Sequence, residues 1–227
     1  MKSAVITFPG SNCDRDMDVA LKKFGFKNKM IWHQDVELPK SDLVVLPGGF
    51  SYGDYLRCGS MASKSKIMQS VINFANSGGM VMGICNGFQI LVETGLVPGV
   101  LLRNKYLEFI CKNVFVKISD KDSAYFKNIK NDVLELHIAH NEGNYFCTND
   151  QLKEIEDNSQ VAINYCNNEG KIEQPFNPNG SIKNIAGIFN KKKNVLGMMP
   201  HPERMIDTSL SGEDGSLFFK NLINNIK

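Results

Sequence analysis

A cysteine stands between two glycines in Gly83-Ile84-Cys85-Asn86-Gly87, directly after an apolar run and directly before an amphipathic stretch. This order of strand, sharp turn and helix is typical of a nucleophile elbow, where the residues two before and two after the nucleophile are small so that strand and helix pass closely. The dipole and free N–H groups of the helix N-terminus favour a thiolate there. We predict that Cys85 is a catalytic nucleophile; the alternative is a structural cysteine between incidental glycines.

A nucleophilic thiol needs a base, and the chain contains four histidines. His201 lies in Met199-Pro200-His201-Pro202-Glu203, where two prolines favour an extended backbone. In an extended chain, residues two apart share a face and lie about 6.6 Å apart, so their side chains can hydrogen-bond. Glu203 would then fix the tautomer of His201 and stabilise its imidazolium form. On spacing alone a surface histidine beside a solvated glutamate is an equal alternative, but together with the elbow the pattern predicts a triad of Cys85, His201 and Glu203.

A glycine turn, Pro47-Gly48-Gly49, follows another apolar run. Backbone N–H groups of such a turn, at the carboxyl end of one strand, can meet the N–H of the residue after the nucleophile at the end of the next strand. We predict that Gly49 and Asn86 form an oxyanion hole through their backbone; a plain loop glycine is the alternative at Gly49.

A second elbow-like motif, Gly49-Phe50-Ser51-Tyr52-Gly53, matches the G-x-S-x-G of serine hydrolases. The glycine turn separates Ser51 from the preceding strand, and residues 54–59 are a poor start for a packed helix. We therefore do not expect Ser51 to be a nucleophile.

Two patterns that suggest metal binding are weak. His201-Pro202-Glu203 matches the opening H-x-E of zinc deaminases, but these need a downstream P-C-x-x-C, and no cysteine follows Cys166. His137 and His140 are three apart in an expected strand, so their side chains would point to opposite faces. We predict no metal site.

The elements that must position these residues follow from the pattern of apolar residues. Short apolar runs bounded by Gly, Pro and Asn predict buried strands, and amphipathic stretches between them predict helices. Their alternation predicts a parallel sheet. The strands expected in this first half are residues 4–8, 29–32, 43–46 and 80–84, and the helices are 15–24, capped by Ser11 or Asn12, 63–76 and 88–94.

Beyond about residue 105 the pattern changes to alternating runs, which predict antiparallel or edge strands. These are residues 106–118, 133–138, 161–165, 185–189 and 195–199, followed by a closing helix at 215–226. Residues 167–181, rich in Asn, Pro and Gly, predict a long surface loop. We expect one α/β domain over residues 1–227, with an open, mostly parallel twisted sheet flanked by helices and extended by antiparallel strands.

Composition limits the class of function. The chain has 227 residues, 42% of them hydrophobic, with 26 basic and 24 acidic side chains and a net charge of +2. Balanced charge gives no electrostatic footprint for nucleic acid or a membrane surface. No apolar run reaches the roughly 18 residues of a spanning helix, and the six cysteines include no C-x-x-C pair. We expect a cytoplasmic protein with free thiols.

The elbow and the distant H-P-E resemble, in this order, the class I (triad-type) glutamine amidotransferases, whose sheet is flavodoxin-like. Within that class the chain is similar to the glutaminase subunits of phosphoribosylformylglycinamidine synthase, and the resemblance spans almost all of it. FSYGDYLRCG together with RNKYLEFICK is typical of that family. The matching segments are residues 5–14, 48–59, 83–91, 103–112, 177–181 and 196–204.

The resemblance implies a standalone subunit that hydrolyses L-glutamine to glutamate and ammonia through a cysteine thioester, in de novo purine biosynthesis. A large synthetase subunit would take the ammonia and bind ATP, magnesium and formylglycinamide ribonucleotide, and a small third subunit would help assemble the complex. No cofactor is expected in this chain, which has no G-x-x-x-x-G-K-[ST] loop. Gln89, one helical turn after Cys85, would hydrogen-bond the bound glutamine, unless it is simply a surface helix residue.

Two other classes of function stay open. One is a non-catalytic assembly or regulatory subunit of that complex; the other is a different cysteine or serine hydrolase on the same sheet. The 167–181 loop is a hypothetical partner contact, because it is long and polar.

Overall fold

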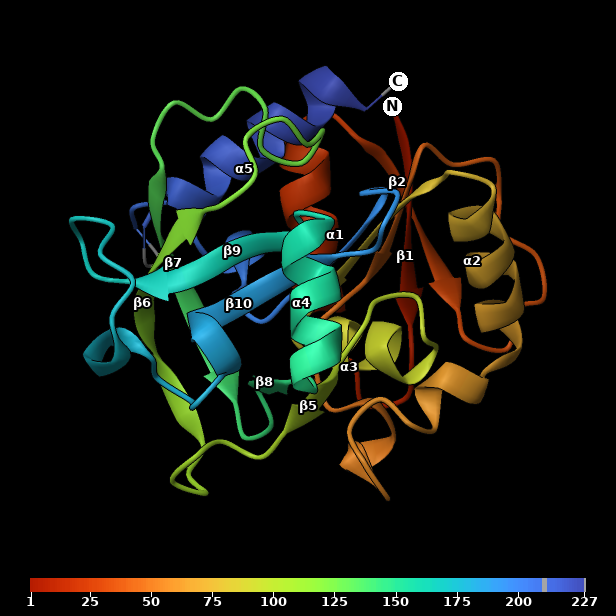
Figure 1. Cartoon of the computed structure of the whole chain (residues 1–227). Helices are drawn as coiled ribbons and strands as arrows, with labels where there is room; N and C mark the ends of the chain where they lie inside the picture. Colours follow the sequence, from red (N-terminus) through yellow and green to blue (C-terminus); the bar gives the residue numbers. More distant parts are fainter. Residues whose placement is uncertain (210–211, 227) are drawn as a thin grey trace.

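The computed structural model describes residues 1–209 and 212–226 of the chain. Within them, a nine-stranded sheet has the order β2-β1-β3-β4-β11-β10-β9-β6-β7 (Figure 1). Its strands are β1 Lys2–Thr7, β2 Lys27–Trp32, β3 Leu43–Leu46, β4 Met80–Ile84, β6 Ile110–Ile118, β7 Val133–His140, β9 Val161–Cys166, β10 Ile185–Phe189 and β11 Val195–Met198. A separate two-stranded ladder joins β5 Val100–Leu102 to β8 Asn144–Phe146. Strands β2, β1, β3, β4 and β11 pair in parallel, and the rest of the large sheet is antiparallel.

Helices cover both faces of the sheet (Figure 1). They are α1 Asp14–Lys23, α2 Lys66–Asn76, α3 Asn86–Glu93, α4 Asn149–Asp157 and α5 Asp214–Asn225, with short 3₁₀ turns at Ser51–Asp54, Ala62–Lys64, Gln174–Phe176, Ile182–Asn184 and Pro202–Arg204. Along the sheet, β2 lies on one side of β1, whereas β4 lies on the opposite side of β3. Because both crossover connections are right-handed, α1 and α2 lie on opposite faces of the sheet. Helix α5 shares the face of α1, since the rings of Phe24 and Phe219 stack with centroids 5.6 Å apart.

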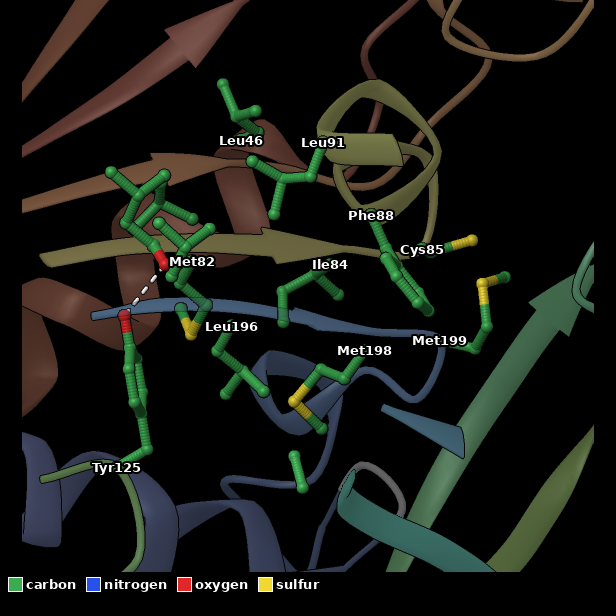
Figure 2. Packing of buried hydrophobic residues seen from close by; sticks show 14 of the residues in the cluster. Leu46, Met82, Ile84, Cys85, Phe88, Leu91, Tyr125, Leu196, Met198 and Met199 are labelled. Carbon is green, nitrogen blue, oxygen red and sulfur yellow. Dashed lines mark hydrogen bonds between the residues drawn. The ribbon is translucent and has the colours of Figure 1, made fainter. Parts of the chain in front are cut away.

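Part of the core lies where α3 packs on the central parallel strands. Figure 2 shows Cys85 directly beyond Ile84 at the end of β4, with Phe88 of α3 beside that strand end. A side chain at Gly197 of β11 would collide with the ring of Phe88, so glycine lets helix and strand approach closely. At the other end of β4, the buried hydroxyl of Tyr125 donates to the carbonyl of Val81 at 2.7 Å.

The predicted mostly parallel sheet with added antiparallel strands is confirmed, but one strand was placed wrongly. Residues 195–199 were expected to form an antiparallel or edge strand, whereas β11 pairs in parallel with β4 near the centre of the sheet. All four of its residues are buried, as in a strand covered on both faces. Its antiparallel partner β10 brings the chain back into the sheet from the other side.

Two local features also differ from the prediction. Helix α1 begins at Asp14, with Cys13 rather than Ser11 or Asn12 at the cap position and no side-chain cap bond. The hydroxyl of Ser11 instead accepts the N–H of Phe8 and holds the turn after β1. Helix α4 was not predicted, although Thr148 and Gln151 form a capping box at its start. No helix in the described part of the chain is long and apolar enough to cross a membrane.

Candidate active site

The carboxyl ends of β3, β4 and β11 meet at one edge of the sheet, because these three strands are parallel neighbours. The glycine turn with Gly49 follows β3, Cys85 follows β4 and His201 follows β11. Strand pairing continues one residue past the ladder, since the N–H of Cys85 donates to the carbonyl of Met198 at 2.8 Å. Three segments far apart in the sequence therefore bring a thiol, an imidazole and a glycine turn to one place, as open α/β sheets do.

Cys85 occupies a strained turn. Its φ of 50° and ψ of −104° are conformations that a residue with a side chain rarely adopts. A Cβ at Gly83 would lie 2.6 Å from the carbonyl oxygen of Gly87, and one at Gly87 would collide with the carbonyl of Leu46. Both flanking glycines are thus needed for β4 and α3 to pass, and the turn presents Cys85 at the N-terminus of α3.

His201 and Glu203 form a buried pair. Nδ1 of His201 lies 2.6 Å from Oε1 of Glu203, and the two side chains are 2% and 0% exposed. Burial by itself lowers the pKa of His201, but the carboxylate of Glu203, then the sulfurs of Cys85 and Cys13, hold that pKa well above its ordinary value. Nε2 of His201 is buried without a hydrogen-bond partner among the described residues, which leaves it for substrate or the thiol.

Backbone contacts hold this pair in place. The N–H of His201 donates to the carbonyl of His137 on β7 at 2.8 Å, and the N–H of Arg204 donates to the carbonyl of His201. Strand β7 also approaches the nucleophile, since Sγ of Cys85 lies 3.6 Å from the carbonyl oxygen of Ala139. This edge of the sheet is therefore bordered by β7 as well as by the parallel strands.

Cys13 is a neighbour of His201 that sequence reasoning missed. Its thiol contacts the imidazole of His201, and the ligand atoms of Cys13, His201 and Glu203 lie within 4.8 Å of one another, all three buried. Such a group could hold a metal ion, but Nδ1 of His201 is already bonded to Glu203. We interpret Cys13 as a contact that supports the ring. Its position in the turn between β1 and α1, at the edge of the sheet where the other site residues lie, is the signal that would have found it.

The structure brings the predicted oxyanion-hole residues Gly49 and Asn86 to the sheet edge next to Cys85, and their role in stabilising an oxyanion stays a prediction. Gly49 has a φ of 141°, in the region that favours glycine, and lines a cavity together with Cys85. Asn86 is the first residue of α3, so its N–H has no carbonyl partner within the helix. The N–H of Phe50, by contrast, is used by the carbonyl of Gly10 at 3.0 Å.

The cavity beside Cys85 has a volume of about 190 Å³ and carries charged groups that sequence reasoning did not single out. Asp54, Arg103 and Glu142 line it, and Nε of Arg103 lies 3.8 Å from a carboxylate oxygen of Glu142. Burial raises the pKa of Asp54, whose Oδ1 has no partner among the described residues. The three residues come from segments 48–59, 103–112 and 140–143, and no local pattern connects these segments.

Gln89 also lines this cavity, and its amide is held on both sides. Its Oε1 accepts from Nδ2 of Asn86 at 2.9 Å, and its Nε2 donates to the carbonyl of Glu142 at 2.7 Å. Each atom has capacity for one further bond, so its expected contact with substrate stays a prediction. The bonds show that Gln89 also ties the 140–143 loop to α3.

The alternative nucleophile is poorly placed. Ser51 is 2% exposed, its Oγ has no hydrogen-bond partner among the described residues, and the cavity beside Cys85 is lined by Phe50 but not by Ser51. His137 and His140 lie on opposite faces of β7, whose residues alternate between half-buried and buried. They do not form a metal pair.

Comparisons with known proteins agree with this geometry. A family model of the CobB/CobQ-like glutamine amidotransferase domain matches residues 1–213. A protein of Pelagibacter ubique (strain HTCC1062), phosphoribosylformylglycinamidine synthase subunit PurQ, is 78% identical over 227 residues and 100% of both chains. The protein of that name from Synechocystis sp. (strain ATCC 27184 / PCC 6803 / Kazusa) is 51% identical over 95% of this chain and 97% of its own.

Solved structures show the same fold. A chain in the structure of PurLQS from Thermotoga maritima matches with a TM-score of 0.87 and 38% identity, over 100% of this chain and 99% of that one. A glutamine amidotransferase from the same organism matches with a TM-score of 0.66 over 100% and 98% of the two chains, at an identity of 16% that supports the fold alone.

Proposed function

Because this chain belongs to the CobB/CobQ-like glutamine amidotransferase family, we propose that Cys85 is the nucleophile of a glutaminase that serves phosphoribosylformylglycinamidine synthase. The chain is the glutamine amidotransferase subunit of that synthase and acts in purine biosynthesis with the large synthetase and small third subunits. The observation that carries the site assignment is the buried His201–Glu203 pair at the strand end next to Cys85.

The reaction starts with attack of the Cys85 thiolate on the side-chain amide carbon of glutamine. The oxygen becomes an oxyanion, which the backbone N–H groups of Gly49 and Asn86 stabilise. Nε2 of His201 gives its proton to the departing nitrogen, the carbon–nitrogen bond breaks, and ammonia leaves a γ-glutamyl thioester on Cys85. Glu203 supports this step because its carboxylate stabilises the imidazolium form of His201.

Hydrolysis of the thioester uses the same groups in reverse roles. Nε2 of His201 takes a proton from water, whose oxygen attacks the thioester carbon, and the same oxyanion hole holds the developing charge. The carbon–sulfur bond then breaks, which releases glutamate and restores the Cys85 thiolate. The proton stays on His201, where its raised pKa favours it, ready for the next turnover.

The charged cavity fits the amino-acid end of glutamine. The carboxylates of Asp54 and Glu142 face a substrate ammonium, and the guanidinium of Arg103 faces its carboxylate. A volume of about 190 Å³ suits one amino acid of this size. Gln89 frames this cavity and can add a hydrogen bond to the substrate.

Ammonia must reach the synthetase without escaping into water, where it becomes protonated and loses its nucleophilicity. We therefore place glutamine hydrolysis here and the use of ATP and magnesium on the large synthetase subunit, in the cytoplasm. Glutaminase activity of the isolated chain is expected to be low and to rise on assembly.

The test uses the assembled complex with Cys85→Ala. Synthesis of formylglycinamidine ribonucleotide from glutamine should fall to background, while synthesis from added ammonium chloride should continue at the wild-type rate. The Ser51→Ala complex should retain both activities. Glutamine-dependent synthesis that survives in Cys85→Ala but not in Ser51→Ala would overturn the assignment in favour of a serine nucleophile.

A further inference from the structure

A second thiol–imidazole pair lies on the antiparallel half of the sheet, outside the active site. Sγ of Cys111 on β6 is 3.5 Å from Nε2 of His137 on β7. These strands are labelled at the left of Figure 1. Asn113 is the register partner of His137, and Cys111 is two residues before Asn113, so all three side chains share one face of the sheet. Cys111 is exposed, whereas the other five cysteines are buried.

The hydrogen bonds around His137 assign the proton on each ring nitrogen. Nδ2 of Asn113 donates to Oε1 of Glu135 at 3.2 Å, which orients the amide so that its oxygen faces the imidazole. That oxygen lies 3.1 Å from Nδ1 of His137, so Nδ1 carries the hydrogen and Nε2 is left to accept one from the thiol. Burial, then the nearby charges of His201 and Arg204, lower the pKa of His137, which favours this neutral form.

Cys111, His137 and Asn113 thus form a chain of nucleophile, base and orienting amide, an arrangement that activates cysteine in other proteins. A base within hydrogen-bond reach can take the thiol proton as the sulfur attacks. Three of the buried thiols are different: burial raises the pKa of Cys58 and Cys147, and that of Cys166 to about 11.

A cavity next to Cys111 offers space for a group attached to its sulfur. It has a volume of about 830 Å³ and is lined by Cys111 and Asn113 on the sheet, and by the segments 104–110 and 174–178. Lys105 and Lys112 line it against the single carboxylate of Glu108, so its charge favours an anion. Tyr106 and Phe109 add apolar surface. This volume lies in the range of small-molecule sites, of roughly 300–1,000 Å³.

We propose that Cys111 is a modification site, at which the thiol forms a mixed disulfide with an anionic disulfide of tripeptide size. The Sγ–H proton passes to Nε2 of His137, and Sγ attacks one sulfur of the disulfide. A new sulfur–sulfur bond forms as the old one breaks, and the departing thiolate takes the proton from His137. The disulfide reagent is the oxidant, and its second half leaves as a thiol.

The experiment uses the full chain with Cys85→Ala, so that the catalytic thiol does not compete. Glutathione disulfide is added, and intact mass spectrometry with peptide mapping follows the adduct. The adduct should form on Cys111 and be absent from Cys85→Ala/Cys111→Ser. Its rate should fall at least tenfold in His137→Gln and severalfold in Asn113→Ala, with unfolding midpoints measured for each variant.

Two comparisons make the outcome decisive. Glutathione disulfide should react severalfold faster than cystamine, a dicationic disulfide, if the cavity holds the substituent. Equal rates in the parent chain, His137→Gln and Asn113→Ala, where the variants remain folded, would overturn the proposal, because Cys111 would then be an ordinary exposed thiol. Faster reaction with cystamine would overturn the assignment of an anionic ligand.

Discussion

The side-chain oxygen of Asn86 accepts the backbone N–H of Ser51 at 3.2 Å, in a buried bond between residues 35 apart. Through its side chain, Asn86 therefore holds the turn after Gly49, and we propose that the backbone N–H groups of these two residues form the oxyanion hole. In Asn86→Ala the backbone N–H remains but the turn with Gly49 is released.

We expect kcat for glutamine hydrolysis in Asn86→Ala to fall by a factor between about 10 and 100, with KM changed far less. The loss should be smaller than the roughly 100-fold loss caused by deleting an oxyanion-hole donor, because the backbone N–H is kept. Steady-state kinetics of the assembled complex checks this. A kcat within twofold of wild type would show that the turn keeps its position without the bond.

Replacing Glu203, the carboxylate beside the proposed catalytic base His201, should slow glutamine hydrolysis. In Glu203→Gln the imidazolium of His201 loses the main group that raises its pKa, while the side-chain size is kept. We expect kcat to fall at least about 100-fold, as for orienting carboxylates in other triads. Glu203→Asp keeps the charge, so its kcat should lie between those of the wild type and Glu203→Gln. Kinetics that leave Glu203→Gln within a few-fold of wild type would remove Glu203 from the triad.

Gly87, two residues after Cys85, should be irreplaceable on steric grounds. In Gly87→Ala the new methyl group would collide with the carbonyl of Leu46, and backbone cannot move away as a flexible side chain can. We expect a loss of several kcal/mol in the free energy of unfolding, as for overpacked cores, or failure to fold. Gly25→Ala is the matched control, because its Cβ meets nothing within 4 Å and only its positive φ of 91° adds a cost of about 1 kcal/mol. Denaturant titrations that place both variants at the same stability would contradict this.

His140 should make the fold sensitive to acid. Burial lowers the pKa of His140 to about 3, from its ordinary value of 6.5. Between these values the unfolded chain binds a proton that the folded chain does not, so the free energy of unfolding falls as pH decreases, by up to about 1.4 kcal/mol per pH unit. His140→Gln should flatten this slope between about pH 6.5 and 3.5, measured by urea unfolding. An unchanged slope would show that His140 is protonated in the folded chain.

Local sequence patterns predicted much of the candidate site. The small residues around Cys85 predicted its turn because the steric demand lies within five residues, and the prolines around His201 indicated its extended backbone. The same holds for Gly49, whose turn ends a strand.

The features that the sequence did not predict depend on contacts between segments far apart in the chain. Residues 195–199 are an apolar run whose neighbours in the sheet no local pattern reveals, so the parallel pairing of β11 with β4 was missed. Asp54, Arg103 and Glu142 meet only because three distant loops fold over one cavity. Cys13 was missed for a related reason, since its contact with His201 depends on the order of strands in the sheet.

The central claim is that Cys85 becomes acylated by glutamine. It is tested most directly by mixing the assembled complex with glutamine, quenching with acid within milliseconds to seconds, and measuring the intact mass of this chain. We predict an increase equal to one glutamyl group, mapped to the peptide with Cys85, absent from Cys85→Ala and unchanged in Ser51→Ala. A glutamyl group on another residue, or steady ammonia release by Cys85→Ala, would contradict the account.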